Sequence, residues 1–259
     1  MRMVNHTRFV TMRYVRAFIR QPAWVLITLI QPMIWLLLFG ALFKRVIEIP
    51  GFNPGGGSYL EFLAPGVIVM SAINSAGWNG MSFIEDMGSG VMDRFLVSPV
   101  WRSALTVGSI IYGALTIGVQ TLIIIGVALA AGAAVPGGVG GVAVIVVLAC
   151  LVGAVFAALS NAVALVLRQR ESLIGAVTMV ILPLTFLSGA FIKPSLAAPW
   201  IGDIAKYNPV NWAVEASRSA GGASADWGLI GSRVGYLVAL LLVSVWLAGR
   251  AFSAYQRSL

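Results

Sequence analysis

The feature that most constrains this chain is a long stretch, residues 103–167, that contains no charged residue. A membrane-spanning helix needs about 20 mostly apolar residues, so this stretch is too long for one span and long enough for two. The sequence PGGVGG, at residues 136–141, interrupts it with residues that break helices. The sequence therefore predicts two membrane helices, at roughly 104–132 and 142–167, joined by a turn.

Four further apolar stretches have the length of a membrane span. Those at residues 23–43, 62–84 and 172–192 carry no charge, and the one at 229–249 carries a single arginine near one end. Only 10% of the chain is charged and 59% is hydrophobic, whereas soluble domains are about 25% charged. We therefore predict an all-α membrane protein whose transmembrane domain, residues 23–259, has six helices.

The positive charges predict how these six helices are oriented. Cytoplasmic segments of membrane proteins are enriched in lysine and arginine. If the N-terminus lies inside, eleven of the seventeen basic residues fall on cytoplasmic segments. We therefore expect both termini in the cytoplasm. The net charge of +8 suits lipid headgroups in this arrangement, and we expect no nucleic-acid partner.

Residues 1–22 have the pattern of an amphipathic helix that lies in the inner membrane interface. Its arginines recur at i, i+3 and i+7, and apolar residues recur at i, i+4 and i+8 on the other face. These two sets are Arg13, Arg16 and Arg20, and Val10, Tyr14 and Phe18. The alternative is a solvated basic tail.

Two segments are expected on the outer side. Residues 44–58 are rich in glycine and proline and predict a flexible loop. Residues 193–226 contain tryptophans that suit the headgroup level. We expect two short helices there, at residues 198–205 and 209–218, with an ordinary ordered loop as the alternative.

Residue patterns of enzymes and ion-coupled carriers are missing from this sequence. His6 is the sole histidine and Cys150 the sole cysteine, and there is no metal-binding, hydrolase or phosphate-loop motif. The first five spans carry no Asp, Glu, Lys, Arg or His, although carriers driven by an ion gradient use such groups within the membrane. We therefore expect a protein that is not an enzyme, binds no cofactor itself and takes its energy from elsewhere.

Neutral polar residues within the spans are candidates for lining a substrate path. In hydrocarbon such side chains need partners, so they face other helices or a cavity. From this set, which also includes Gln31 and Asn161, we assign a path to Asn74, Ser75, Asn79 and Gln120. The alternative is that they only hydrogen-bond neighbouring helices. Because six helices enclose little polar space, we expect the path to run between two copies of the chain.

Residues 85–102, EDMGSGVMDRFLVSPVWR, form a compact charged segment between two apolar spans. Glu85 and Asp86 must leave the lipid, and glycines allow the backbone to turn. Residues 91–96 then predict a short helix that Pro99 ends. We interpret the segment as a stiff cytoplasmic element between two membrane helices, the alternative being a plain loop.

This segment also resembles the signature of ABC-2-type exporter permeases, the membrane subunits of type V ABC exporters such as daunorubicin-resistance pumps. The matching residues are Glu85, Asp86, Gly90, Asp93, Arg94, Phe95, Pro99 and Arg102. FLAPG at residues 62–66, PLTFLSGAFI at 183–192, and then Trp200 and YNPV at 207–210 are similar to further parts of the family pattern.

The resemblance implies a division of labour. Two permease subunits, this chain twice or with a paralogue, would pair in the bacterial cell membrane above two separate ATPase subunits that bind ATP and Mg²⁺. Residues 85–99 would be the coupling helix that contacts the ATPase. The cargo would be a small amphiphile, namely a drug, antibiotic or lipid, moved out of the cytoplasm or inner leaflet. The alternatives are a permease for a lipid-linked glycan and a non-transporting membrane scaffold.

Overall fold

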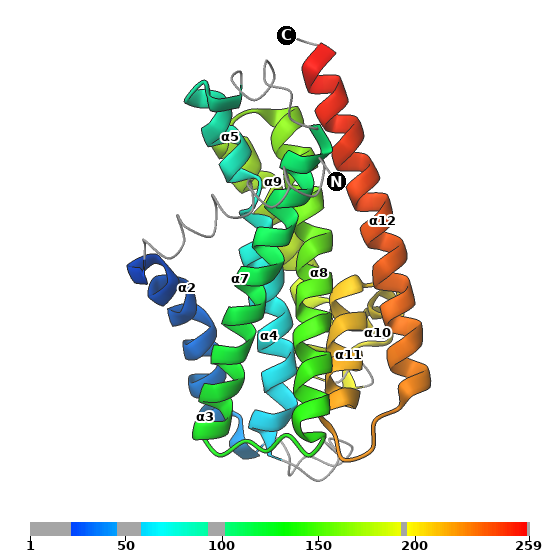
Figure 1. Ribbon diagram of the computed structural model, residues 1–259. Coiled ribbons are helices and arrows are strands. Elements are labelled where there is room, and N and C mark those ends of the chain that lie inside the picture. The colour runs from blue at the N-terminus through cyan, green and yellow to red at the C-terminus, as the bar shows by residue number, and fades with distance from the viewer. Residues whose placement is uncertain (1–21, 46–57, 93–101, 193–195, 258–259) are drawn as a thin grey trace.

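A computed structural model describes residues 22–45, 58–92, 102–192 and 196–257. Within these ranges the chain is helical and contains no β-strand. The helices run up and down in one elongated bundle (Figure 1). The predicted all-α fold is therefore confirmed for the described part of the chain, whereas the expected N-terminal amphipathic helix lies almost entirely outside it.

The uncharged stretch forms two long antiparallel helices, as predicted. These are α7 (Arg102–Ala130) and α8 (Gly138–Leu167). The turn between them contains Pro136 and Gly137, whereas the rest of the PGGVGG sequence forms the first turn of α8. Two further helical segments are long and apolar enough to cross a membrane: residues 59–88, made of α4 (Tyr59–Gly77) and α5 (Met81–Gly88), and α12 (Trp227–Arg257). Four predicted spans thus have helices of spanning length.

The other two predicted spans are shorter. The first consists of α2 (Pro22–Ile34), the π-helix η1 (Trp35–Phe39) and α3 (Gly40–Leu42). The fifth is α9 (Arg170–Phe186), whose 17 residues rise about 25 Å, less than the roughly 30 Å of a bilayer core. Among the described residues, four helices are long enough to cross a membrane and a fifth apolar helix is shorter. The number of six spans therefore stays a prediction.

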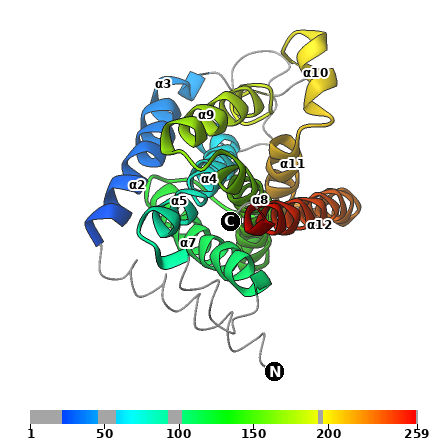
Figure 2. The same cartoon turned by 90° about the horizontal axis from the view of Figure 1, so that it is seen from above.

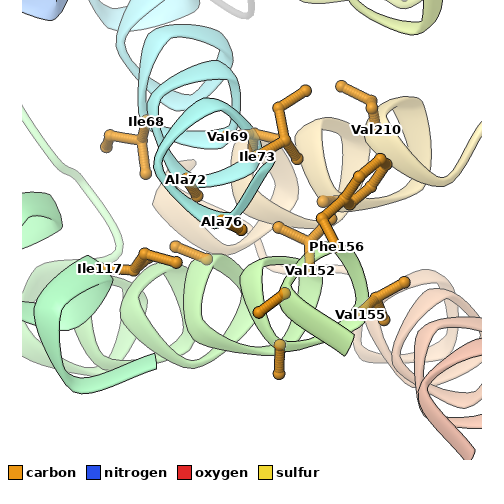
Figure 3. Close-up of a cluster of buried hydrophobic side chains, with 14 of the residues drawn as sticks. Ile68, Val69, Ala72, Ile73, Ala76, Ile117, Val152, Val155, Phe156 and Val210 are labelled. Carbon is orange, nitrogen blue, oxygen red and sulfur yellow. The ribbon is translucent and has the colours of Figure 1, made fainter. Parts of the chain in front are cut away.

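Helix α8 lies at the centre of the bundle and packs against α4, α7, α11 and α12. Seen from above, α4 and α8 are surrounded by the other helices, and α2 lies at the periphery (Figure 2). Small residues allow the close packing, since Ala157 and Ala158 of α8 have no exposed surface. In Figure 3, apolar side chains of α8 meet those of α4, α7 and α11, and the cluster includes Ile73, Ile117 and Phe156.

The segment predicted to lie on the outer side contains the two short helices that the sequence predicts, although the second is longer and more deeply packed than expected. Helix α10 (Pro199–Ala205) precedes α11 (Pro209–Gly221). Helix α11 lies against α8 and α12 (Figure 1), with Val210 and Val214 fully buried. Its end also contacts the PGGVGG turn, where the Gly137 N–H donates to the Gly221 carbonyl at 3.1 Å. Helix α11 is therefore part of the bundle.

Candidate functional site

A cavity of about 300 Å³ lies between α2, α4 and α7. Every residue of the predicted substrate path is on its wall: Asn74, Ser75, Asn79 and Gln120. None of its lining residues is ionisable except the phenol of Tyr112. The lining is Thr28, Gln31, Pro32, Trp35, Val67, Met70, Ser71, Asn74, Ser75, Trp78, Asn79, Ser82, Tyr112, Gly113, Thr116, Ile117 and Gln120.

The polar side of the cavity is an ordered hydrogen-bond chain between α4 and α7. The Ser75 hydroxyl donates to Gln120 Oε1 at 2.8 Å, and Gln120 Nε2 donates to the Ser71 hydroxyl at 2.6 Å. These bonds hold the Gln120 amide in place, because both of its ends are engaged. Ser75 and Gln120 thus line the cavity and also bond between helices, and their place in a substrate path stays a prediction.

Asn79 connects the cavity with the centre of the bundle. Its Nδ2 donates to the Ser109 hydroxyl of α7 at 2.7 Å and to Asn161 Oδ1 of α8 at 3.2 Å. Asn161 is fully buried. Asn79 therefore lines the cavity and also fixes the relative positions of three helices.

Aromatic rings form another part of the wall, in the first predicted span. Pro32 has no N–H, which removes a hydrogen bond of α2, and the next turn widens into η1. Trp35 of η1 lines the cavity, and its ring lies 4.5 Å from that of Phe39 and 5.2 Å from that of Phe191. The rings of Trp78 and Tyr112 belong to the same cavity. This wall combines flat apolar rings with uncharged hydrogen-bonding groups.

The cavity lies within one copy of the chain, and the hypothesis of a path between two copies stays a prediction. The polar face of the second span contains Ser71, Asn74, Ser75 and Ser82. In the structure this face meets α2 and α7 of the same chain. The spacing of polar residues identified the face, but it could not identify the neighbouring helix, since hydropathy does not encode helix order around a bundle.

The predicted coupling residues are only partly described. Glu85, on α5, forms an exposed 2.6 Å ion pair with Arg170 at the start of α9. Asp86 is buried, and Gly90 adopts φ +68°, the left-handed conformation that favours glycine. Arg102 is the first residue of α7. Asp93, Arg94, Phe95 and Pro99 lie outside the described residues.

Sequence reasoning missed the partly buried Arg218 of α11. Its guanidinium donates to the carbonyls of Phe62 at 3.1 Å and Ala190 at 2.9 Å, and lies 3.5 Å from the centre of the Phe62 ring. Burial lowers the pKa of Arg218 to about 9, so it keeps its charge at pH 7. Its position could have been suspected, because Val210, Val214 and Arg218 recur at i, i+4 and i+8.

Arg218 joins the start of α4 to the turn after α9. The same contact explains Gly66 of the FLAPG sequence, where a Cβ atom would come within 2.4 Å of the Ala190 carbonyl oxygen. Nearby, Glu215 pairs with Arg233 of α12 at 2.9 Å. Among the described residues, no three His, Cys, Asp or Glu side chains gather as a metal site would require.

Comparison with known proteins gives consistent results. A family model described as ABC-2 type transporter matches residues 5–220. The daunorubicin resistance ABC transporter permease protein DrrB1 of Streptomyces coeruleorubidus is 31% identical over 210 residues, covering 80% of this chain and 71% of that protein. The putative transport permease ycf38 of Porphyra purpurea is 28% identical over 77% of this chain and 68% of its own length. The inner membrane transport permease YadH of Escherichia coli K12 is 28% identical, with 74% of each chain covered.

Proposed function

Because this chain belongs to the ABC-2 type transporter family, and is thus a multi-pass transport permease, we propose that it exports a small amphiphile with an uncharged polar headgroup. The proposal includes the direction, out of the cytoplasm or the inner leaflet, and the cargo class of drug, antibiotic or lipid. The antibiotic named in the relative DrrB1 supports efflux. Both termini are proposed to be cytoplasmic, in a bacterial cell membrane.

The single observation that carries the cargo class is the composition of the cavity between α2, α4 and α7. Burying a charge without a partner is costly, whereas hydroxyl and amide groups can be satisfied by neutral side chains. The wall offers such groups from Ser71, Asn74 and Gln120, together with the rings of Trp35 and Trp78. Its volume is at the lower end of the roughly 300–1,000 Å³ typical of ligand pockets. It therefore suits one ring-sized headgroup better than an extended glycan.

Energy is proposed to come from a separate ABC ATPase subunit, two copies of which act on two permease copies. Family membership implies the ATPase partner, and the sequence has no phosphate-loop motif of its own. Glu85 and Asp86, at the inner end of α5, lead into the segment proposed to contact that partner. ATP and Mg²⁺ would be bound by the ATPase.

Copurification tests this assignment. The chain is tagged in its native host, purified in mild detergent and examined for bound proteins and ATP hydrolysis. We expect an ABC ATPase to copurify in equal amount and the complex, but not the permease alone, to hydrolyse ATP. A permease that retains no ATPase under any mild extraction would instead support the non-transporting scaffold.

A further inference from the structure

The second predicted span is broken between α4 and α5, at the turn Trp78–Gly80. The turn is closed by short-range bonds, from the Asn79 N–H to the Ala76 carbonyl and from the Met81 N–H to the Trp78 carbonyl, both 3.0 Å. The break lies level with the cavity, because Trp78 and Asn79 both line it. A change of direction at this turn would therefore move α5 relative to the cavity wall.

Ser160 of α8 clamps the turn from the opposite side. Its hydroxyl donates to the Gly77 carbonyl at 2.5 Å and accepts from the Gly80 N–H at 3.0 Å. These are backbone groups that the interrupted helix leaves without their usual partners. Helix α8 approaches so closely that a Cβ atom on Gly80 would come within 2.5 Å of the Ser160 carbonyl oxygen. These contacts between Ser160 and the turn therefore require glycine at position 80.

Asn79 forms the second attachment of the turn, and this attachment is incompletely satisfied. Asn79 Nδ2 reaches Ser109 and Asn161 as described above, but Nδ2 of Asn161 is fully buried and has no hydrogen-bond partner among the described residues. A buried donor without a partner is unfavourable. A second arrangement in which the Asn161 amide is satisfied would therefore compete with this one.

The ion pair at the far end of α5 adds little to what holds this helix, whereas Phe83, Ile84 and Asp86 are buried against the bundle. The Glu85–Arg170 pair is exposed, with more than half of each side chain accessible (57% and 54%), and exposed ion pairs contribute little. Helix α5 leads through Gly90 into the segment proposed to contact the ATPase. The buried bonds at the turn are therefore well placed to determine the direction of α5.

From this geometry we propose that the Trp78–Gly80 turn is a hinge, and that Asn79 links occupancy of the cavity to the direction of α5. A cargo hydroxyl or carbonyl that bonds the Asn79 amide competes with Ser109 and Asn161, which frees the turn to adopt its second arrangement. The inference rests on the proposed function, since it assumes that the cavity receives cargo. Asn79 acts here as a positioning residue between two sites.

Hydrogen–deuterium exchange of the purified permease tests the hinge without ATPase or cargo. In Ser160→Ala and Asn79→Ala, which each remove two side-chain hydrogen bonds, we expect amides of α5 to exchange about 5- to 30-fold faster. Amides in the first half of α8 should keep their wild-type rates. The matched control is Ser244→Ala, a buried serine of α12 that bonds the Leu240 carbonyl. Unchanged α5 exchange in both variants would overturn the proposal.

The link to the cavity is tested by filling it chemically. In a Cys150→Ala background, Ser75→Cys is labelled with benzyl methanethiosulfonate, a neutral aromatic reagent, and Leu122→Cys, on the exposed face of α7, is the labelled control. We expect faster α5 exchange after labelling at position 75 and no change after labelling at 122. Equal α5 exchange rates after labelling at the two positions would refute the link, while leaving the ATPase assignment untouched. Because this labelling experiment keeps the native hinge residues, it also tests the proposal if the alanine variants fail to fold.

Discussion

At the scale of single residues, replacing Arg218 gives the most specific prediction about the stability of the protein. Arginine bonds the carbonyls of Phe62 and Ala190 from two different nitrogens of its planar guanidinium. Lysine keeps the charge but has a single ammonium nitrogen, so Arg218→Lys should weaken at least one of these bonds. We expect the free energy of unfolding to fall by about 1–3 kcal/mol, measured by thermal unfolding in nanodiscs. The control is Arg250→Lys, whose exposed guanidinium lies over the Trp246 ring. Equal losses of stability would contradict the proposed role of Arg218.

Asn74 provides a residue-scale test of the cavity. Asn74→Leu replaces an amide of the cavity wall with an apolar group, so it should change which amphiphiles stimulate ATP hydrolysis by the permease–ATPase complex, with protein yield near wild type. Asn208→Leu is the contrasting variant, because Asn208 Nδ2 donates to the carbonyls of Leu184 and Leu187, and its yield should fall. If Asn74→Leu lowers yield and leaves the stimulation profile intact, Asn74 is structural.

The polar residues of the cavity could be selected from the sequence, but their partners could not. An uncharged polar group in an apolar span indicates a need for a partner, which is why Asn79 and Gln120 were recognisable. That Gln120 bonds Ser71 and Ser75 depends on which helices become neighbours, and hydropathy contains no such information. Arg218 was overlooked because a charge in an outer segment is ordinarily solvated.

At the scale of elements, the coupling segment yields a direct prediction. Asp93→Ala combined with Arg94→Ala should leave the permease inserted but weaken ATPase binding or separate hydrolysis from transport, since truncating a charged interface contact typically costs about 2–5 kcal/mol. Both are measured by pull-down and by ATP hydrolysis of the copurified complex. The control removes the exposed Lys206–Asp203 pair of α10. Wild-type binding and transport in the Asp93/Arg94 variant would contradict the assignment.

Long elements were predictable because span length and missing charge are strong signals. The ends of α7 and α8 lie within a few residues of the predicted ones, although α8 already begins at Gly138, inside the PGGVGG sequence that was expected to form the turn. The break in the second span was missed because residues 62–84 carry no charge, and an uncharged stretch of that length was interpreted as one continuous helix. The Asn79–Gly80 dipeptide, a typical turn signal, could have indicated it. The burial of α11 depends on its packing against α8 and α12, and the residue pattern of α11 alone did not predict it.

At the scale of the whole molecule, membrane orientation is open to chemical labelling. Cysteine at Ser224, in the exposed bend before α12, should react with an impermeant thiol reagent from outside cells in a Cys150→Ala background. Cysteine at Ser89, exposed at the end of α5, should react only after permeabilisation. The reverse pattern would show that the distribution of arginines does not determine the orientation.

Lipid transfer between leaflets tests the central claim most directly. The permease and its copurified ATPase are reconstituted in proteoliposomes with three fluorescent lipids of matched acyl chains, bearing a neutral sugar, an anionic phosphoglycerol or a cationic trimethylammonium headgroup. Dithionite quenching reports which leaflet holds each probe. We predict ATP-dependent transfer that is fastest for the neutral headgroup and lost in Asn79→Ala. Active ATP hydrolysis without ATP-dependent transfer of the neutral probe, or faster transfer of a charged one, would contradict the account.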